Sequence, residues 1–144
     1  MRKTYTGKIK PGKNIIYCYG SNTEGRHGKG AALIAKTLFG AIYGQSKGLQ
    51  GNSYAIITKD LTKSIHPSIS KEYIIEQIEE LYLFAVNNPL LEFHIAYRVD
   101  SIFLNSYSLE DMVYMFARNS IPNNIVFEDK FYELIRESKT RSLF

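Results

Sequence analysis

The stretch NIIYCYGSNTEGRHGKGAALIAKTLFG, residues 14–40, is the most informative part of the sequence about the fold class. It opens with a β-branched and aromatic run at 14–19, which predicts a buried strand. A glycine-rich polar loop follows at 20–28. Apolar residues then recur at helical spacing over 29–39, and Gly40 favours a helix end there. The order of strand, glycine loop and helix predicts the first unit of an α/β fold.

The same alternation continues along the chain. Three strand-like runs and three helical patterns follow in turn, with strands at 53–58, 91–98 and 125–127, and helices at 70–86, 108–118 and from 131. Such alternation predicts an α/β fold with a mainly parallel sheet and helices on both faces. We expect one domain over residues 1–144, with a basic segment at 1–13 and a loose tail at 138–144.

Composition excludes several broad classes of protein. The hydrophobic fraction of 44% and the charged fraction of 22% are ordinary for a globular chain. No apolar run approaches the ~18 residues of a membrane helix, and the first six residues do not resemble a secretory signal. The single cysteine, Cys18, allows no internal disulfide and is expected in the core. We therefore expect a cytoplasmic protein with no membrane partner, no metal and no cofactor.

Positive charge and glycine share one half of the chain. Residues 1–63 hold eleven Lys and Arg against two Asp and Glu, which gives +9, whereas residues 64–144 hold seven against twelve, which gives −5. Eight of the ten glycines fall between Gly20 and Gly51. Glycine combined with positive charge is typical of anion-binding sites.

The first glycine loop has the features of a phosphate site. N–H groups and the positive dipole end at a helix start attract phosphate. Gly28 and Gly30 have no Cβ to keep a diphosphate from the backbone. Arg26, His27 and Lys29 add positive or hydrogen-bonding groups. The loop has neither the P-loop pattern nor a regular Gly-x-Gly-x-x-Gly, which disfavours an ATPase and an ordinary dinucleotide fold. The alternative is that these glycines only form a turn.

Parallel sheets usually bind ligands outside the carboxyl ends of their strands. The first loop should lie at that edge, and so should Lys59 and Asp60. Lys59 could bind a phosphate, and Asp60 could bind a sugar or base. Alternatively, both could belong to an exposed strand end followed by a turn. Asn22 could bind a ribose or base through its amide, or could cap the loop. The second glycine loop, residues 40–52, precedes a strand and reaches the site only if it folds back.

These considerations give a set of candidate site residues. The ligand-binding candidates are Gly20, Ser21, Asn22, Gly25, Arg26, His27, Gly28, Lys29, Gly30, Gln50, Gly51, Asn52, Thr58, Lys59 and Asp60. The catalytic candidates are Asn22, His27 and Lys59.

Two motifs carry a family resemblance. Residues 19–32, Tyr-Gly-Ser-Asn-x-x-Gly-Arg-His-Gly-x-Gly-Ala-Ala, and residues 48–60, Gly-Leu-x-Gly-x-Ser-Tyr-Ala-Ile-x-Thr-Lys-Asp, resemble those of a largely uncharacterised family of small bacterial and phage proteins. The resemblance continues through softer motifs and covers residues 14–135. That family is similar to distant macro domains, which bind ADP-ribose and in some cases hydrolyse its linkages.

The resemblance implies a three-layer α/β/α fold and assigns roles to several residues. Asn22 would orient the distal ribose, residues 28–30 would hold phosphate, and His27 and Lys59 would lie near the reaction centre. A second glycine-rich loop normally wraps the diphosphate in macro domains. The corresponding segment here, residues 99–105, contains no glycine, and this departure weighs against a diphosphate clamp of that kind.

We therefore expect binding of ADP-ribose or a related nucleotide, with hydrolysis of an ADP-ribosyl bond as an additional activity. One alternative is a nucleic-acid-binding accessory protein, which the +9 half and the basic segment 1–13 favour. Another is a phage protein that captures a host signalling nucleotide or blocks a host enzyme. Nucleic-acid binding should weaken steeply with salt, whereas binding of a mononucleotide in a pocket should weaken less.

Overall fold

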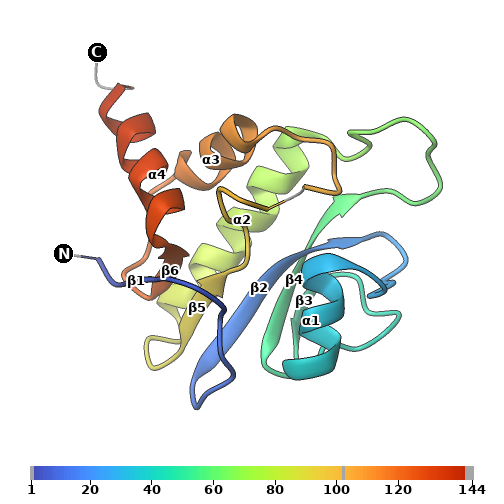
Figure 1. Cartoon of the computed structure of the whole chain (residues 1–144), viewed down its shortest axis with the longest axis horizontal. Helices are drawn as coiled ribbons and strands as arrows, with labels where there is room; N and C mark the ends of the chain where they lie inside the picture. The colour runs from blue at the N-terminus through green and yellow to red at the C-terminus, as the bar shows by residue number, and fades with distance from the viewer. Residues whose placement is uncertain (1, 102, 142–144) are drawn as a thin grey trace.

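A computed structural model describes residues 2–101 and 103–141, which form an α/β structure around one six-stranded sheet (Figure 1). The strands are β1 (Thr4–Tyr5), β2 (Ile15–Asn22), β3 (Gly48–Gln50), β4 (Ser53–Lys59), β5 (Glu92–Ile95) and β6 (Ile125–Glu128). The helices are α1 (Gly30–Leu38), α2 (Lys71–Val86), α3 (Leu109–Ala117) and α4 (Asp129–Arg141).

The sheet confirms the predicted α/β class with mainly parallel strands. The strand order is β1-β6-β5-β2-β4-β3, and every neighbouring pair is parallel except β3 and β4, which are antiparallel. β2 is central: Cys18 pairs with Tyr54 of β4 on one side and with Ile95 of β5 on the other.

Alternate side chains of β2 enter two separate cores, because successive residues of a strand point to opposite faces. Ile16 and Cys18 join the larger core, which α2, α3 and α4 complete. Tyr17 and Tyr19 join a smaller core with α1. Helices thus cover both faces of the sheet, in agreement with a three-layer arrangement (Figure 1). Cys18 is buried, as predicted.

None of the helices in the described part of the chain has the length and apolar character to cross a membrane.

The N-terminal basic segment is part of the fold, which the sequence did not predict. It contains β1, which pairs with β6. The Arg2 guanidinium donates hydrogen bonds to three main-chain carbonyls between residues 121 and 125. The Tyr5 hydroxyl donates to the carbonyl of Ile95 at 2.6 Å. A two-residue strand has too few residues to show a period, so only its partners reveal it.

Several predicted boundaries were wrong. The first strand continues through Gly20 to Asn22, because its backbone goes on pairing with β4, so the glycine loop begins only after Asn22. The strand expected at 91–98 ends at Ile95. The tail expected from residue 138 is helical as far as Arg141, and residues 142–144 lie outside the described part. The second glycine loop contains the short strand β3.

Candidate functional site

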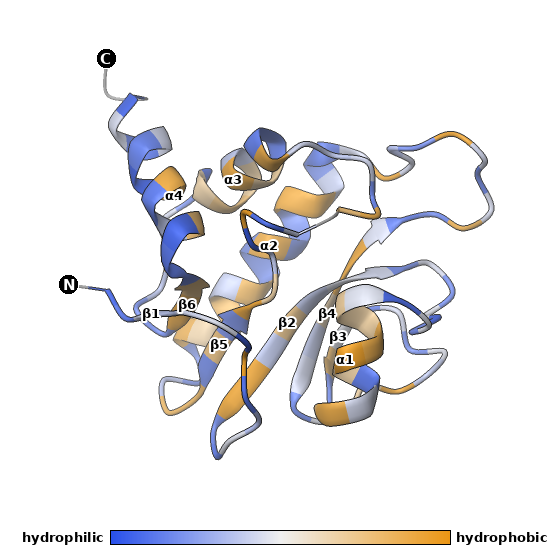
Figure 2. Cartoon of the chain, viewed as in Figure 1, coloured by the Kyte–Doolittle hydropathy of each residue, from blue (hydrophilic) through white to orange (hydrophobic). Residues whose placement is uncertain are grey.

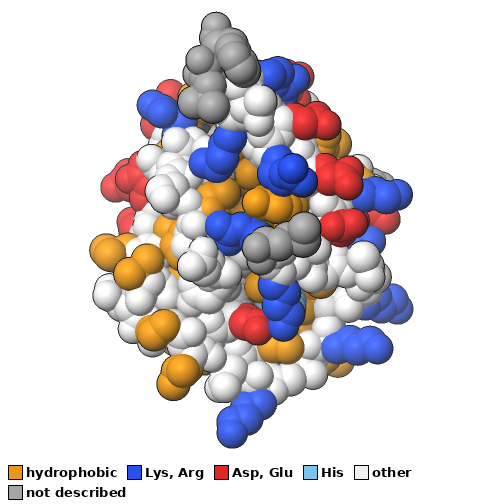
Figure 3. Space-filling view, turned by 90° about the vertical axis from the view of Figure 1, so that its left-hand side faces the viewer, with side chains coloured by type: hydrophobic (Ala, Val, Ile, Leu, Met, Phe, Trp, Pro, Cys, Tyr) orange, Lys and Arg blue, Asp and Glu red, His pale blue; other side chains and the backbone are white. Residues whose placement is uncertain are grey.

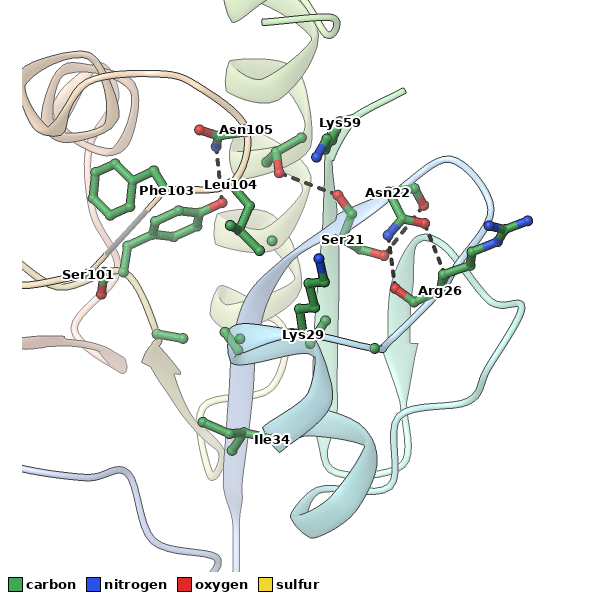
Figure 4. A pocket seen from close by; sticks show the side chains of 18 of the residues that line it. Ser21, Asn22, Arg26, Lys29, Ile34, Lys59, Ser101, Phe103, Leu104 and Asn105 are labelled. Carbon is green, nitrogen blue, oxygen red and sulfur yellow. Dashed lines mark hydrogen bonds between the residues drawn. The ribbon is translucent and has the colours of Figure 1, made fainter. Parts of the chain in front are cut away.

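A cleft of about 890 Å³ lies at the carboxyl ends of β2 and β4 (Figure 4). Its volume falls within the ~300–1,000 Å³ typical of ligand pockets. One wall is formed by the loop after β2 and the start of α1. The opposite wall is formed by residues that follow β5, namely 96–98, 100–101 and 103–105. The cleft therefore lies at the sheet edge where the sequence predicted the site.

The crevice arises from the way the chain leaves two neighbouring strands. β2 and β5 are adjacent and parallel, but β2 leads to α1 on one face of the sheet and β5 leads to α3 on the other. The two departing segments separate and leave a gap between them. Such switch points are the usual ligand sites of open α/β sheets.

The start of α1 faces this gap without a side-chain cap. The hydroxyls of Ser70 and Ser108 accept main-chain N–H groups at the starts of α2 and α3. Lys29, at the corresponding place of α1, makes no such hydrogen bond, and the first turn holds no acidic residue. Residues 28–32 line the cleft. The free N–H groups and the positive helix end are thus available to an anion.

The α1 helix packs on the sheet through its small residues and exposes its larger ones. Ala32 and Ala35 are buried, whereas Leu33, Ile34 and Leu38 are exposed. In Figure 2 much of the α1 ribbon has the orange of hydrophobic residues. Alanines let a helix approach a sheet closely because they are small. Ile34 borders the cleft and supplies part of its apolar wall.

The floor of the cleft is held by a hydrogen-bond network around Tyr97. Asn105 Nδ2 donates to the Tyr97 hydroxyl at 3.3 Å, and that hydroxyl also bonds to Thr58. Thr58 Oγ1 in turn donates to the Ser21 carbonyl at 3.3 Å. The Tyr97 hydroxyl lies so close to Gly20 that any Cβ there would collide with it. Burial raises the pKa of Tyr97 to about 12. The network ties the segment after β5 to the ends of β2 and β4.

Two arginines line the cleft, and each faces a carboxylate. Arg26 Nη2 lies 3.7 Å from Glu24 Oε1, and Arg98 Nε lies 3.0 Å from Asp100 Oδ1. The hydrogen bond from Arg98 lowers the pKa of Asp100. Both arginines therefore have their charge at least partly compensated.

Lys29 and Lys59 complete the cationic lining. Neither makes an ion pair with any of the residues that the structure describes. They come from different elements, the start of α1 and the end of β4, where Lys59 pairs with Asn22 of β2. Figure 4 shows both side chains directed toward Ser21 at the end of β2.

The structure brings nine of the predicted site residues to the cleft. They are Gly20, Ser21, Asn22, Arg26, Gly28, Lys29, Gly30, Thr58 and Lys59. The other six, Gly25, His27, Gln50, Gly51, Asn52 and Asp60, are not among the residues that line it.

His27 belongs to the smaller core and is not part of the cleft wall. It is only 1% exposed, its Nε2 lies 3.1 Å from the Tyr19 hydroxyl, and its ring contacts Tyr43 edge-on. Burial, followed by the charge of Lys36, lowers its pKa. The sequence placed His27 in the right loop, but the direction of its side chain depends on that core.

Asn22 and Asp60 have hydrogen-bond partners that fix local turns. The Asn22 amide donates to the Arg26 carbonyl at 2.8 Å and accepts from the Arg26 N–H at 2.9 Å. Asn22 therefore borders the cleft, and its side chain fixes the turn from residue 22 to residue 26. Asp60 accepts from the hydroxyl and the N–H of Thr62 at 2.6 and 2.9 Å, and the hydroxyl bond is the main cause of its lowered pKa. Both residues thus have the turn-forming role that the sequence left as an alternative.

The second glycine loop lies mostly at the far end of β4. Gln50 Oε1 accepts the N–H of Ile42 at 2.7 Å, and Gly51 packs against Gly40. Asn52 donates its N–H to the Phe39 carbonyl at 2.8 Å. These residues shape the loop away from the cleft.

Only the middle of the second loop folds back toward the first. The N–H of Gly44 donates to the Gly25 carbonyl at 2.9 Å, which braces the first loop without lining the cleft.

Residues of the opposite wall were absent from the predicted site. Tyr97, Arg98, Asp100, Ser101, Phe103, Leu104 and Asn105 all line the cleft. Two signals pointed to them: they lie at or just after the carboxyl end of the strand predicted at 91–98, and the family resemblance put its second loop at 99–105.

No three His, Cys, Asp or Glu side chains are grouped to hold a metal ion anywhere in the described ranges. Comparisons of the chain with family models, curated proteins and solved structures find no match. Function must therefore be inferred from the cleft itself.

Proposed function

We propose that the cleft binds ADP-ribose or a related nucleotide or phosphate ligand. The observation that carries this proposal is the uncapped start of α1, which faces a cleft at the sheet's switch point. Lys29 and Lys59 line the same cleft and make no ion pair with the described residues. Helix starts and lysine amines are both good partners for phosphate. The resemblance of residues 19–32 to macro-domain relatives supports the same ligand class.

Hydrolysis of an ADP-ribosyl bond is a further step that the cleft supports less directly. Turnover needs a positioned water or nucleophile and groups that stabilise developing charge. Of the three catalytic candidates, His27 lies in the small core, and the amide of Asn22 is occupied by Arg26. Lys59 remains at the cleft. The arrangement supports binding without requiring turnover.

A thermal-shift panel tests the proposal. ADP-ribose, NAD, AMP and cyclic nucleotides are added to the full chain, and the unfolding midpoint is recorded for each. A ligand at 100 times its dissociation constant should stabilise the fold by about 2.7 kcal/mol. A rise of the midpoint is expected with at least one of these compounds. If none of them raises it, the proposal is wrong.

Replacing Gly28 with valine should abolish ligand binding and leave the fold intact. Gly28 lines the cleft, and a Cβ built there meets no atom within 4 Å, so the side chain occupies only the space of the ligand. The unfolding free energy should change by no more than about 0.5 kcal/mol. Calorimetric titration measures the loss of binding. Thr37→Val is the matched control, because Thr37 is exposed on α1 and does not line the cleft. Unchanged affinity in Gly28→Val would show that phosphate binds elsewhere.

The charges on the face that carries α4 and the N-terminal segment do not favour the nucleic-acid alternative. The Arg2 guanidinium donates to main-chain carbonyls, and Lys3 Nζ lies 3.0 Å from Glu92 Oε2. On the face that carries α4 and the N-terminal segment, acidic and basic side chains are interspersed (Figure 3). A nucleic-acid site usually needs a patch of one sign.

A further inference from the structure

The cleft gathers its uncompensated positive charge at one place. Arg26 and Arg98 each face a carboxylate, and they lie on different walls. Lys29 and Lys59 make no ion pair with the described residues, and both are directed toward Ser21 (Figure 4). Two positive charges that line the same cleft and are directed toward the same serine match a group that carries two negative charges in a small volume.

Ser21 adds a hydrogen-bond donor at the same place. The residue is only 4% exposed, and its hydroxyl donates to the Asn22 carbonyl oxygen at 3.5 Å. That distance is at the outer limit for a hydrogen bond, so the hydroxyl is poorly satisfied. A hydroxyl with so long a hydrogen bond can turn toward a better acceptor. A phosphate oxygen between the lysines would supply one.

The opposite wall offers no comparable place for a second phosphate. Residues 99–105 contain no glycine that would bring backbone N–H groups close to the ligand. Leu104 instead reaches across the cleft, and its Cδ1 lies 3.7 Å from where a Cβ of Gly30 would be. Phe103 and Leu104 line this wall, and Ile34 faces them from α1. The part of the ligand beyond the lysines therefore meets mainly apolar side chains.

We propose that the cleft prefers a ligand with a terminal phosphomonoester, held between Lys29 and Lys59 with Ser21, whose aromatic or apolar body lies toward Leu104 and Ile34. A nucleoside monophosphate has this chemistry, whereas ADP-ribose carries its phosphates inside a diphosphate bridge. This inference rests on the proposed function and narrows its ligand class.

The ionisation of the ligand gives a direct test. A phosphomonoester gains its second negative charge with a pKa of about 6, whereas 3′,5′-cyclic AMP and ADP-ribose have no ionisation of this kind. Calorimetric titration of the full chain with AMP should show affinity about tenfold weaker at pH 5 than at pH 7.5. Cyclic AMP should bind more weakly than AMP at pH 7.5 and keep the same affinity at both pH values. It controls for any titration of the protein, which would affect both ligands.

The titratable and charged groups that line the cleft around the phosphate position are Arg26, Lys29, Lys59, Tyr97, Arg98 and Asp100. The pKa of Asp100 is lowered by Arg98, and that of Tyr97 is raised to about 12 by burial.

Four results would overturn the inference, and they differ in what they say of the proposed function. Tighter binding of ADP-ribose than of AMP, or equal affinity for AMP at both pH values, would refute the phosphomonoester preference and leave nucleotide binding standing. Adenosine binding as tightly as AMP would refute any role for phosphate. Failure of every compound to bind would refute both proposals.

Lysine variants locate the phosphate. Lys29→Gln and Lys59→Gln should each weaken AMP binding about tenfold or more, because each removes a hydrogen bond between charged groups. Both variants should leave adenosine binding unchanged. Lys36→Gln is the matched control, since Lys36 lies on α1 over the Tyr43 ring and does not line the cleft. If all three variants behave alike, the phosphate does not lie between Lys29 and Lys59.

Discussion

Replacing Gly51 with alanine should lower the free energy of unfolding by about 3 kcal/mol or more, although Gly51 does not line the cleft. Its backbone has φ +58°, a conformation that strains any residue with a side chain. A Cβ there would also lie 2.5 Å from the Gly40 carbonyl oxygen and 2.8 Å from its carbon. Both obstacles belong to the main chain, so no side-chain rotation can relieve them.

Urea unfolding of the full chain measures this loss, and the melting midpoint should fall by about 10 °C. Gly48→Ala is the matched control, because Gly48 has φ +80° but a Cβ there meets no atom within 4 Å. The control therefore reports the backbone strain alone. Equal losses in the two variants would show that the contact between Gly51 and Gly40 is not a constraint.

Replacing Gly20 with alanine should cost about 2 to 3 kcal/mol, and replacing Tyr97 with phenylalanine in the same chain should restore part of that loss. The alanine Cβ collides with the Tyr97 hydroxyl, which Asn105 holds in place. Without that hydroxyl, the nearest atoms are Tyr97 Cζ and Thr58 Oγ1, both at 3.1 Å. Such contacts are tight, but shifts of a few tenths of an ångström relieve them.

A double-mutant cycle in urea measures the coupling between these positions. Tyr97→Phe alone should destabilise by about 1 kcal/mol, because it removes hydrogen bonds to Asn105 and Thr58. The double variant should be more stable than Gly20→Ala by at least about 1 kcal/mol. Tyr54→Phe is the control, since Tyr54 is buried in β4 and does not line the cleft. Additive losses would mean that the Tyr97 hydroxyl does not restrict Gly20.

Much of the fold could be predicted because it follows from local patterns. The β-branched run at 14–19 and the helical spacing at 70–86 each lie within one element, and both elements are present as β2 and α2. β1 and β3 were not predicted, because they depend on contacts with distant parts of the chain. Each has only two or three residues, and each exists because it pairs with a strand formed elsewhere in the chain.

In the candidate site too, some residues could be predicted from local patterns and others could not. Gly28, Lys29 and Lys59 were found because they stand next to the ends of predictable elements. His27 stands in the same loop but faces the small core, because Tyr19 and Tyr43 pack around it. No periodicity in the sequence encodes that direction.

The order of the main strands and helices can be predicted from the sequence, and with it the sheet edge at which the cleft lies. Strand and helix patterns are local, so they can be recognised without knowing any distant contact. Which residues meet at that edge depends on tertiary contacts. The Tyr97 hydroxyl occupies the space next to Gly20, and the main chain of Gly40 occupies the space next to Gly51. Lys29 and Lys59 come from separate elements and line the same cleft. Each of these relations joins separate elements of the chain, whose contacts depend on how the sheet and its crossovers bring them together.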